Sequence, residues 1–322
     1  GRSAAGRFKG DSTMKRQKVI ITAAVVGTAH MASMSPYFPV KPEDIIQQAV
    51  DACAAGAASI HIHGRDRETG EPTSDIGLIR EVVSGIKESC DAIVCITTGG
   101  SQMMTVEERI SVVPALKPEL ASCNAGSMNF VLSDLVSHLK PDDPEWEYKY
   151  LGGTYDNVFA NTYYGIETYI RTMQENGTVP EFEVYDASMI NNIAYFRNKG
   201  ILTGPVYIQF VMGIQGGIPA TVDNLVFLRT TAERLLEDSF TWSVAAAGKH
   251  QMPIAAVALA MGGNVRVGLE DNLYIRPHQL AKSNAEQVHA AATMAGILGR
   301  EVATPDEARA ILGLKGKNQV NY

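Results

Sequence analysis

Short apolar segments alternate along this chain with longer segments whose apolar residues recur at helical spacing. Eight short segments, rich in β-branched or apolar residues, are predicted strands: residues 18–24, 58–63, 92–97, 119–124, 181–186, 206–212, 240–246 and 265–271. Between most of them the spacing predicts helices: residues 42–55, 75–88, 164–175, 188–198, 222–236 and 253–261. Strands that alternate with helices indicate parallel βαβ units.

Eight strands in one unbroken alternation predict a closed (β/α)8 barrel, a TIM barrel, with an open doubly wound sheet as the alternative. No glycine-rich nucleotide-binding motif supports the open sheet. After the eighth strand, two more helices are predicted over residues 283–298 and 304–312, the second with Thr304 as its cap. The expected fold is an α/β barrel with extra C-terminal helices and one domain over residues 14–322. Residues 1–13 lack periodicity and are interpreted as a leader or an expression remnant.

Composition and charge narrow the functional classes. The 322 residues are 45% hydrophobic and 20% charged, and 28 basic against 35 acidic residues give a net charge of −7. No apolar run reaches the roughly 18 residues of a membrane span, and no secretion signal is recognisable, which indicates a cytoplasmic protein. The acidic balance without a basic cluster argues against nucleic acid or a membrane surface as partner. Four cysteines without a Cys-x-x-Cys pair are expected to be free thiols.

Two histidines end the second predicted strand, in the run Ser59-Ile60-His61-Ile62-His63. Side chains alternate along a strand, so both imidazoles share one face and the two isoleucines share the other. In a barrel that face is the interior, and the carboxyl end of a strand is where function concentrates. The alternative is a pair of structural histidines.

The eighth predicted strand carries Arg266 and Glu270 on its interior face, with Gly268 between them. A buried arginine and carboxylate are costly unless they pair or bind something. A structural ion pair is therefore the alternative to a functional role. Asp271 follows Glu270 and can enter the same site only where the strand gives way to a loop.

Only the first strand separates the second and eighth strands around a closed barrel, a span of roughly 10 Å. His61, His63 and Glu270 are therefore expected to converge. Two imidazoles and one carboxylate are the ligand set of a catalytic zinc site with a position open for substrate. Iron accepts a similar set, but a non-redox ion is the simpler expectation.

The third and fourth strands end in polar, glycine-containing segments. Their candidate substrate-binding residues are Thr97, Gly99, Gly100, Ser122 and Asn124. Hydroxyls and main-chain amides at strand ends can hold a carboxylate or enolate oxygen, whereas ordinary turn chemistry is the alternative. The glycine-rich loop 213–219 and Lys249 are weaker candidates for contacts with an anion.

Taken together, these motifs resemble the β-keto acid cleavage enzymes typified by 3-keto-5-aminohexanoate cleavage enzyme. The likeness covers residues 19 to about 299. It rests on Thr22-Ala23-Ala24, Pro42-Glu43, His61-x-His63, Thr98-Gly99-Gly100, Asn124-x-Gly126-Ser127-x-Asn129, Gly216-Gly217, Thr241-Trp242-Ser243 and Arg266-x-Gly268-x-Glu270-Asp271-Asn272.

The resemblance implies a zinc-binding barrel, commonly a homotetramer, that condenses a β-keto acid with acetyl-CoA to give acetoacetate and a new acyl-CoA. It implies that His61, His63 and Glu270 bind zinc, and that Asp271, assisted by Arg266, is the catalytic base. The C-terminal helices and the tail 318–322 are candidates for subunit contacts. A zinc hydrolase or aldolase that acts without CoA, and a barrel that only binds, remain the other functional classes.

Two positions depart from the family pattern. Where the founding activity places a glutamate that holds the substrate's amine, this chain has Ala29, with His30 beside it. We therefore expect a substrate with a neutral or anionic tail, contacted by His30. Thr97 replaces the expected serine and keeps its hydroxyl.

Overall fold

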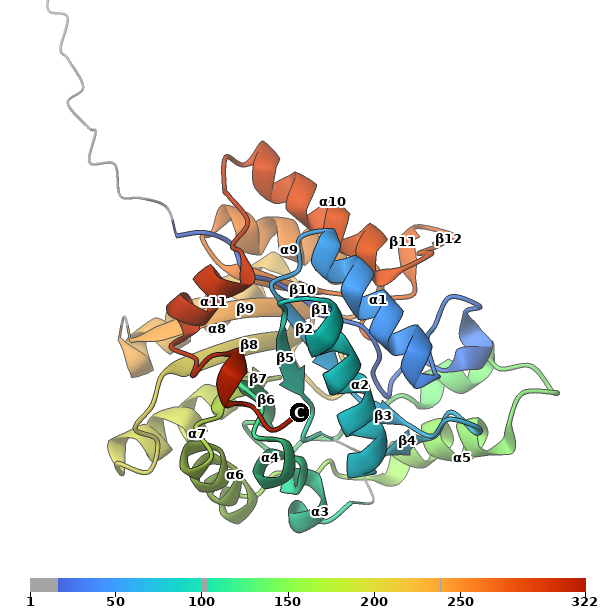
Figure 1. Ribbon diagram of the computed structural model, residues 1–322, viewed down its shortest axis with the longest axis horizontal. Helices are drawn as coiled ribbons and strands as arrows, with labels where there is room; N and C mark the ends of the chain where they lie inside the picture. Colours follow the sequence, from blue (N-terminus) through green and yellow to red (C-terminus); the bar gives the residue numbers. More distant parts are fainter. Residues whose placement is uncertain (1–16, 100–103, 238) are drawn as a thin grey trace, which may run out of the picture.

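The computed structural model describes residues 17–99, 104–237 and 239–322. Eight parallel strands close into a barrel in the order β1-β10-β9-β8-β7-β6-β5-β2 (Figure 1). The strands are β1 (Ile21–Ala24), β2 (Ser59–Ile62), β5 (Ile93–Ile96), β6 (Leu120–Asn124), β7 (Val179–Val184), β8 (Val206–Met212), β9 (Phe240–Ala246) and β10 (Asn264–Val267). Each of the eight overlaps a predicted strand, and β1 pairs with both β2 and β10. The predicted (β/α)8 barrel is thereby confirmed over the open sheet.

Helices surround the barrel (Figure 1). They are α1 (Pro42–Ala54), α2 (Ile76–Ser89), α3 (Val106–Ile110), α4 (Val112–Leu116), α5 (Glu145–Gly153), α6 (Tyr163–Glu175), α7 (Ala187–Asn198), α8 (Val222–Leu236), α9 (Gln251–Ala260), α10 (Asn284–Ile297) and α11 (Pro305–Leu312). Thr304 and Glu307 form a reciprocal capping box at the start of α11, as the sequence predicts. Among the helices of the described ranges, none combines the length and apolar character that a membrane crossing requires.

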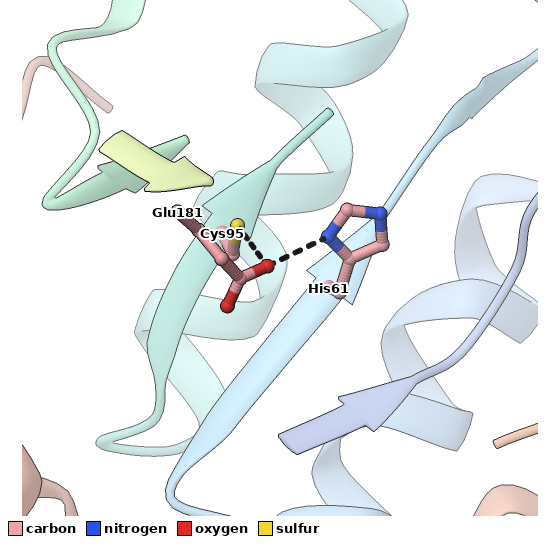
Figure 2. A group of neighbouring side chains, drawn as sticks. All are labelled: His61, Cys95 and Glu181. Carbon is pink, nitrogen blue, oxygen red and sulfur yellow. Dashed lines mark hydrogen bonds and ion pairs between the residues drawn. The ribbon is translucent and has the colours of Figure 1, made fainter. Parts of the chain in front are cut away.

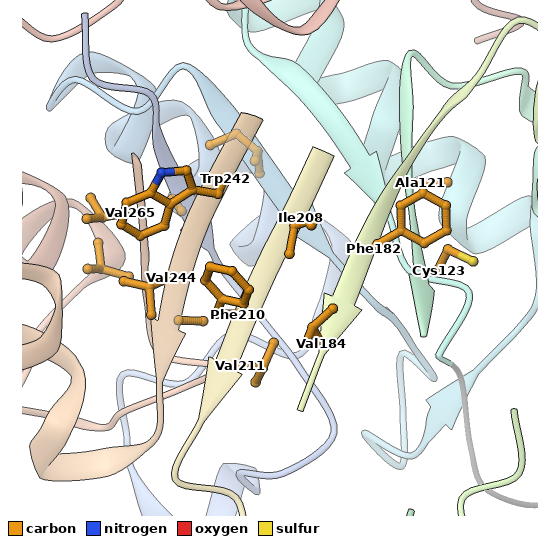
Figure 3. Close-up of a cluster of buried hydrophobic side chains, with 14 of the residues drawn as sticks. Ala121, Cys123, Phe182, Val184, Ile208, Phe210, Val211, Trp242, Val244 and Val265 are labelled. Atoms are coloured by element: carbon orange, nitrogen blue, oxygen red, sulfur yellow. The ribbon is translucent and has the colours of Figure 1, made fainter. Parts of the chain in front are cut away.

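The strands direct alternate residues to opposite sides of the barrel wall. Phe182, Ile208 and Phe210 belong to the buried apolar layer between the strands and the helices (Figure 3). The intervening residues, such as Glu183 and Gln209, face the interior, where they meet Arg266. The outer face therefore stabilises the barrel, and the inner face is left for polar groups.

The amino-terminal end of the barrel is closed by α11. Ala308 and Leu312 of this helix form a buried cluster with residues at the strand starts, including Ile20, Ile93 and Leu120. The expected extra C-terminal helices are therefore present, and α11 seals this end. The chain's own last residues pack nearby: the main-chain nitrogen of residue 321 donates to the carbonyl of residue 116 at 2.8 Å.

The strand predicted over residues 265–271 ends earlier, at Val267. A Cβ atom on Gly268 would lie 2.1 Å from the carbonyl oxygen of Ala24, so only glycine permits this close approach of two backbones. The chain then turns, with the amides of Asp271 and Asn272 donating to the Gly268 carbonyl. Glu270 therefore enters the site from a turn and not, as predicted, from the strand.

Several smaller elements were not predicted. Two short hairpins, β3 (Gly64–Arg65) with β4 (Pro72–Thr73) and β11 (Tyr274–Arg276) with β12 (Gln279–Leu280), extend from strand ends. The 3-10 helix η2 (Ser133–His138) and α5 lie between β6 and α6. Leu132 and Leu151 from this segment pack against Met31 in the loop after β1. The segment thereby forms a wall at the carboxyl end of the barrel.

Candidate active site

A cavity of about 390 Å³ lies at the carboxyl ends of the strands. Its lining includes eight of the residues predicted for the site: His30, His63, Thr97, Gly99, Asn124, Arg266, Glu270 and Asp271. One wall is apolar and includes Phe130, Leu132, Leu135, Tyr150, Phe159 and Ile214. The cavity therefore combines a polar floor with an apolar side wall, as small-molecule sites commonly do.

The three predicted metal ligands lie together at this floor. His61 Nε2 is 3.2 Å from His63 Nε2 and 3.6 Å from Glu270 Oε2, and His63 Nε2 is 3.3 Å from Glu270 Oε1. A Cβ atom on Gly27 would lie 2.1 Å from Glu270 Cγ, so the loop after β1 packs directly against this carboxylate. The backbone at Gly27 therefore helps to define where Glu270 lies.

The spacing of these three side chains fits a metal ion. A tetrahedral zinc ion about 2.0–2.1 Å from each ligand separates the ligand atoms by roughly 3.3 Å. Within the described part of the chain, Glu270 Oε2 is buried without a hydrogen-bond partner, whereas Oε1 accepts from Arg266 Nη2 at 2.6 Å. Arg266 thus holds one oxygen of the Glu270 carboxylate, and the other oxygen is available to a metal ion. This arrangement suits a carboxylate that binds the metal through one atom.

The charge states of these groups agree with that fit. Burial lowers the pKa of His61 well below its ordinary value, which keeps the imidazole neutral. Burial alone would raise the pKa of Glu270, but the positive charge of Arg266 outweighs it and holds the pKa below its usual range. A neutral imidazole at His61 and an ionised carboxylate at Glu270 are the forms that bind metal.

Arg266 connects the remaining acidic groups of the floor. Its Nε and Nη2 donate to the two oxygens of Asp271 at 2.8 and 2.9 Å, while Nη1 donates to Glu183 at 3.2 Å and Gln209 at 3.0 Å. With the bond to Glu270, one buried guanidinium contacts three carboxylates. The predicted interior pair of Arg266 and Glu270 is present, as part of this larger network.

Asp271 lies in the turn beside Glu270, and both carboxylates reach the cavity. Burial raises the pKa of Asp271 above that of an ordinary aspartate, against the opposing effect of Arg266. A carboxylate with a raised pKa that is held by a bidentate arginine is suited to accept a proton at a defined position.

The predicted substrate-binding residues near the carboxyl ends of β5 and β6 differ in whether they line the cavity. Thr97, Gly99 and Asn124 line the cavity, and both side-chain polar atoms of Asn124 are buried with no hydrogen-bond partner among the described residues. Ser122 is not part of the lining, because its hydroxyl accepts from the main-chain nitrogen of Thr98 at 3.2 Å. Gly100 lies outside the described residues. Asn124 is therefore the best placed of this group to contact a ligand.

His30 lines the cavity next to Ala29. Its Nδ1 donates to the main-chain oxygens of Glu270 at 2.9 Å and Leu269 at 3.1 Å. Burial lowers the pKa of His30, so the ring is neutral. The weaker candidates also line the cavity: Gly213, Ile214 and Gln215 follow β8, and Lys249 follows the neighbouring strand β9 in the 3-10 helix η4 (Gly248–His250).

The sequence analysis missed the acidic residues of β7. Glu181 and Glu183 both point into the barrel, and burial raises the pKa of Glu183 above its usual range. A signal was available, because two glutamates at alternate positions of a predicted interior strand share its inner face. Gln209, on the inner face of β8, was also not predicted, although the same alternation of side chains would have indicated it.

The closed barrel and the polar cavity at the carboxyl ends of its strands define a TIM-barrel enzyme. The model of the beta-keto acid cleavage enzyme family matches residues 18–314, and the chain belongs to that family.

Individual relatives agree. The chain is 44% identical over 307 residues to the 3,5-dioxohexanoate:acetyl-CoA acetone transferase of Paraburkholderia graminis, covering 95% of this chain and 99% of the relative. It is 42% identical over 299 residues to the 3-keto-5-aminohexanoate cleavage enzyme of Acetoanaerobium sticklandii, covering 92% and 99%. A solved structure, the binary complex of ObcA with oxaloacetate, superposes with a TM-score of 0.66 at 20% identity over 87% of this chain and 68% of that chain, which supports the fold alone.

Proposed function

We propose that this protein transfers the acetyl group of acetyl-CoA to a β-keto acid and releases acetoacetate and a new acyl-CoA. The observation that carries the proposal is the pairing, on one cavity floor, of the group His61, His63 and Glu270 with the Asp271–Arg266 pair. Family membership and relatives named as acetyl-CoA transferases support the same reaction. For a substrate R–CO–CH2–COO⁻, the products are R–CO–SCoA and CH3–CO–CH2–COO⁻.

We propose zinc as the ion held by His61, His63 and Glu270, since their spacing and protonation states suit it. A zinc ion bound there would supply a Lewis acid for the keto oxygen of the substrate and make the neighbouring CH2 group more acidic. Asn124 lies in the same cavity with an unpaired amide, which is available to hold a carboxylate or enolate oxygen.

Asp271 is the proposed base. It takes one proton from the CH2 group, and the resulting carbanion forms a C–C bond to the acetyl carbonyl as CoA thiolate leaves. The thiolate then adds to the original keto carbon, the bond between that carbon and the CH2 carbon breaks, and acetoacetate recovers the proton from Asp271. Arg266 holds Asp271 in place and offsets the negative charge that the site carries during these steps.

We extend the proposal to the substrate's tail, which we infer to be uncharged. The side of the cavity at Ala29 is bounded by His30, Leu132 and Tyr150, and His30 is neutral because burial lowers its pKa. The charged lining residues Asp134 and Lys249 are exposed. Of the described residues at this side, His30, Leu132 and Tyr150 carry neither a carboxylate for an ammonium group nor a cation for a carboxylate. The relative from P. graminis is named for 3,5-dioxohexanoate, whose tail is likewise uncharged.

We also propose a cytoplasmic homotetramer. The four free thiols suit a reducing compartment. The tetramer rests on the family resemblance, and exposed aromatic side chains such as Tyr164 are available for subunit contacts. Light scattering on the full chain gives the mass that tests it.

An isotope-labelling experiment tests the proposed transfer of the acetyl group from acetyl-CoA. The protein is incubated with acetyl-CoA carrying ¹³C in its acetyl group and with unlabelled β-keto acids. The proposed reaction places all label in acetoacetate, while the new acyl-CoA is unlabelled. Cleavage that proceeds without acetyl-CoA supports the hydrolase or aldolase instead, and no product with any β-keto acid supports a barrel that only binds.

A further inference from the structure

A second group of buried side chains lies on the other edge of the His61 ring. His61 of β2, Cys95 of β5 and Glu181 of β7 meet in the barrel interior, and each is 1% exposed or less (Figure 2). The proposed reaction uses His61 through Nε2, which points to His63 and Glu270. The opposite nitrogen, Nδ1, points to Glu181 (Figure 2).

The polar atoms of this group are only partly paired. His61 Nδ1 lies 4.0 Å from Glu181 Oε1, which also accepts from the thiol of Cys95 at 3.6 Å. In the described part of the chain, neither His61 Nδ1 nor Glu181 Oε2 has a hydrogen-bond partner. A buried imidazole nitrogen and a buried carboxyl oxygen without partners each carry a desolvation cost, so a short bridge between the imidazole and the carboxyl group is favoured.

The surroundings suit such a bridge. Among the described residues, the hydroxyl of Ser59 is also buried without a partner, and Ser59 pairs in register with Thr22 of β1. Ser59 is two positions before His61, so both side chains emerge on the same face. Several unsatisfied polar atoms in one buried region are commonly bridged by an ordered water.

We infer that Glu181 is a positioning residue that accepts the Nδ1–H of His61, directly after a small approach or through one water. An N–H donor at Nδ1 leaves the lone pair on Nε2, which is the form that binds a metal. Either protonation state of the Glu181 carboxyl can accept this bond. The Cys95 thiol donates to the same carboxyl oxygen and restricts its orientation. The inference rests on the proposed zinc site.

The same three side chains have a second interpretation, in which they hold an ion of their own. Nδ1 would then be a ligand and not a donor. The two interpretations differ in stoichiometry, because the positioning role requires one zinc per chain and a second ion requires two. Metal content of the full chain, measured by mass spectrometry of the native protein, separates them.

Zinc affinity tests the positioning role without relying on turnover. The dissociation constant is measured by competition with a chromophoric chelator for the wild type, Glu181→Gln and Glu181→Leu. Removing a partner of a metal-bound histidine costs about 10- to 100-fold in affinity, so we expect roughly tenfold for the amide and roughly 100-fold for leucine. The control is Glu119→Gln, the same change at another buried glutamate, which contacts Arg309 of α11 and not His61 or Arg266. Its zinc affinity should stay within about threefold of the wild type.

A second measurement protects the test against variants that fold poorly. In wild-type protein with ¹⁵N-labelled histidine, NMR should show His61 with its proton on Nδ1 in the zinc-loaded chain. Three results would each overturn this inference and leave the proposed function standing. They are equal zinc affinity in the wild type and both Glu181 variants, a His61 without a proton on Nδ1, and two ions per chain. A wild type that binds no zinc would overturn the proposed metal site as well.

Discussion

The guanidinium of Arg266 holds the carboxylate of Asp271 through two nearly parallel hydrogen bonds, from Nε to Oδ2 at 2.8 Å and from Nη2 to Oδ1 at 2.9 Å. A bidentate pair of this kind fixes both the position and the plane of the carboxylate. Each oxygen keeps a lone pair, so Asp271 can still accept a proton. The same guanidinium donates to Glu270, which ties the proposed base to the proposed metal site.

Asp271→Asn should reduce kcat by about 10²- to 10⁴-fold, the usual contribution of a positioned base. Asparagine retains the size of the side chain but cannot take the proton. Zinc content should not change, because Asp271 is not in the ligand group. Steady-state rates and metal analysis of the same preparation check both parts, and near-normal turnover would exclude Asp271 as the base.

The rate should also depend on pH in a defined direction. Burial raises the pKa of Asp271 above the ordinary 3.8, and the base works only when ionised. The value of kcat/KM should therefore fall as the pH falls through this raised pKa, and the acidic limb should lie above pH 3.8. A pH profile measured within the stable range checks this. A flat profile down to pH 4 would contradict it.

Removal of the metal should abolish turnover and lower the midpoint of thermal unfolding. An ion that binds only the folded chain stabilises it, by about 2.7 kcal/mol at a free concentration 100 times the dissociation constant. Chelation followed by dialysis gives the metal-free chain, and added zinc should restore both properties. Full activity in chain shown to be metal-free would contradict the zinc proposal.

Gly27→Ala should weaken zinc binding, because the added methyl group would lie 2.1 Å from Glu270 Cγ and displace that side chain. A loss of about tenfold in affinity is expected, comparable to the loss of a supporting residue at a metal site. Gly204→Ala is the matched control, since no atom lies within 4 Å of its added carbon. Equal zinc affinity in both variants would show that Glu270 does not depend on the loop after β1.

The uncharged tail predicts how the substrate preference can be changed. Ala29→Glu should raise kcat/KM for β-keto acids with an ammonium tail and lower it for uncharged tails, each by about tenfold. Ala29→Gln has a similar size without the charge and should not favour the ammonium tail. Competition between the two substrates, with acyl-CoA products measured by mass, checks the ratio. A wild type that already prefers a charged tail would overturn this part of the proposal only.

The sequence predicts the strands well because their residues alternate, or are uniformly apolar, over four to seven positions that the barrel buries. It does not predict where β10 ends, since that depends on the approach of Gly268 to Ala24, about 240 positions away in the chain. The state of His30 depends in the same way on the carbonyls of Leu269 and Glu270. The role of Ser122 also depends on a partner in another loop, Thr98. The periodicity of a sequence predicts local structure. It does not predict these features, because each depends on a contact between separate segments of the chain.

The seal that α11 makes with Ile20, Ile93 and Leu120 also governs the order of binding events. Because the amino-terminal end of the barrel is closed, substrates enter the cavity only from the carboxyl ends of the strands. Acetyl-CoA is much larger than the β-keto acid and must bind nearer to the entrance. Under the proposed reaction, the keto acid therefore arrives first and acetyl-CoA second, and acyl-CoA departs before acetoacetate. The sequential, compulsory-order kinetics of such an enzyme would originate in a helix at the opposite end of the barrel from its chemistry.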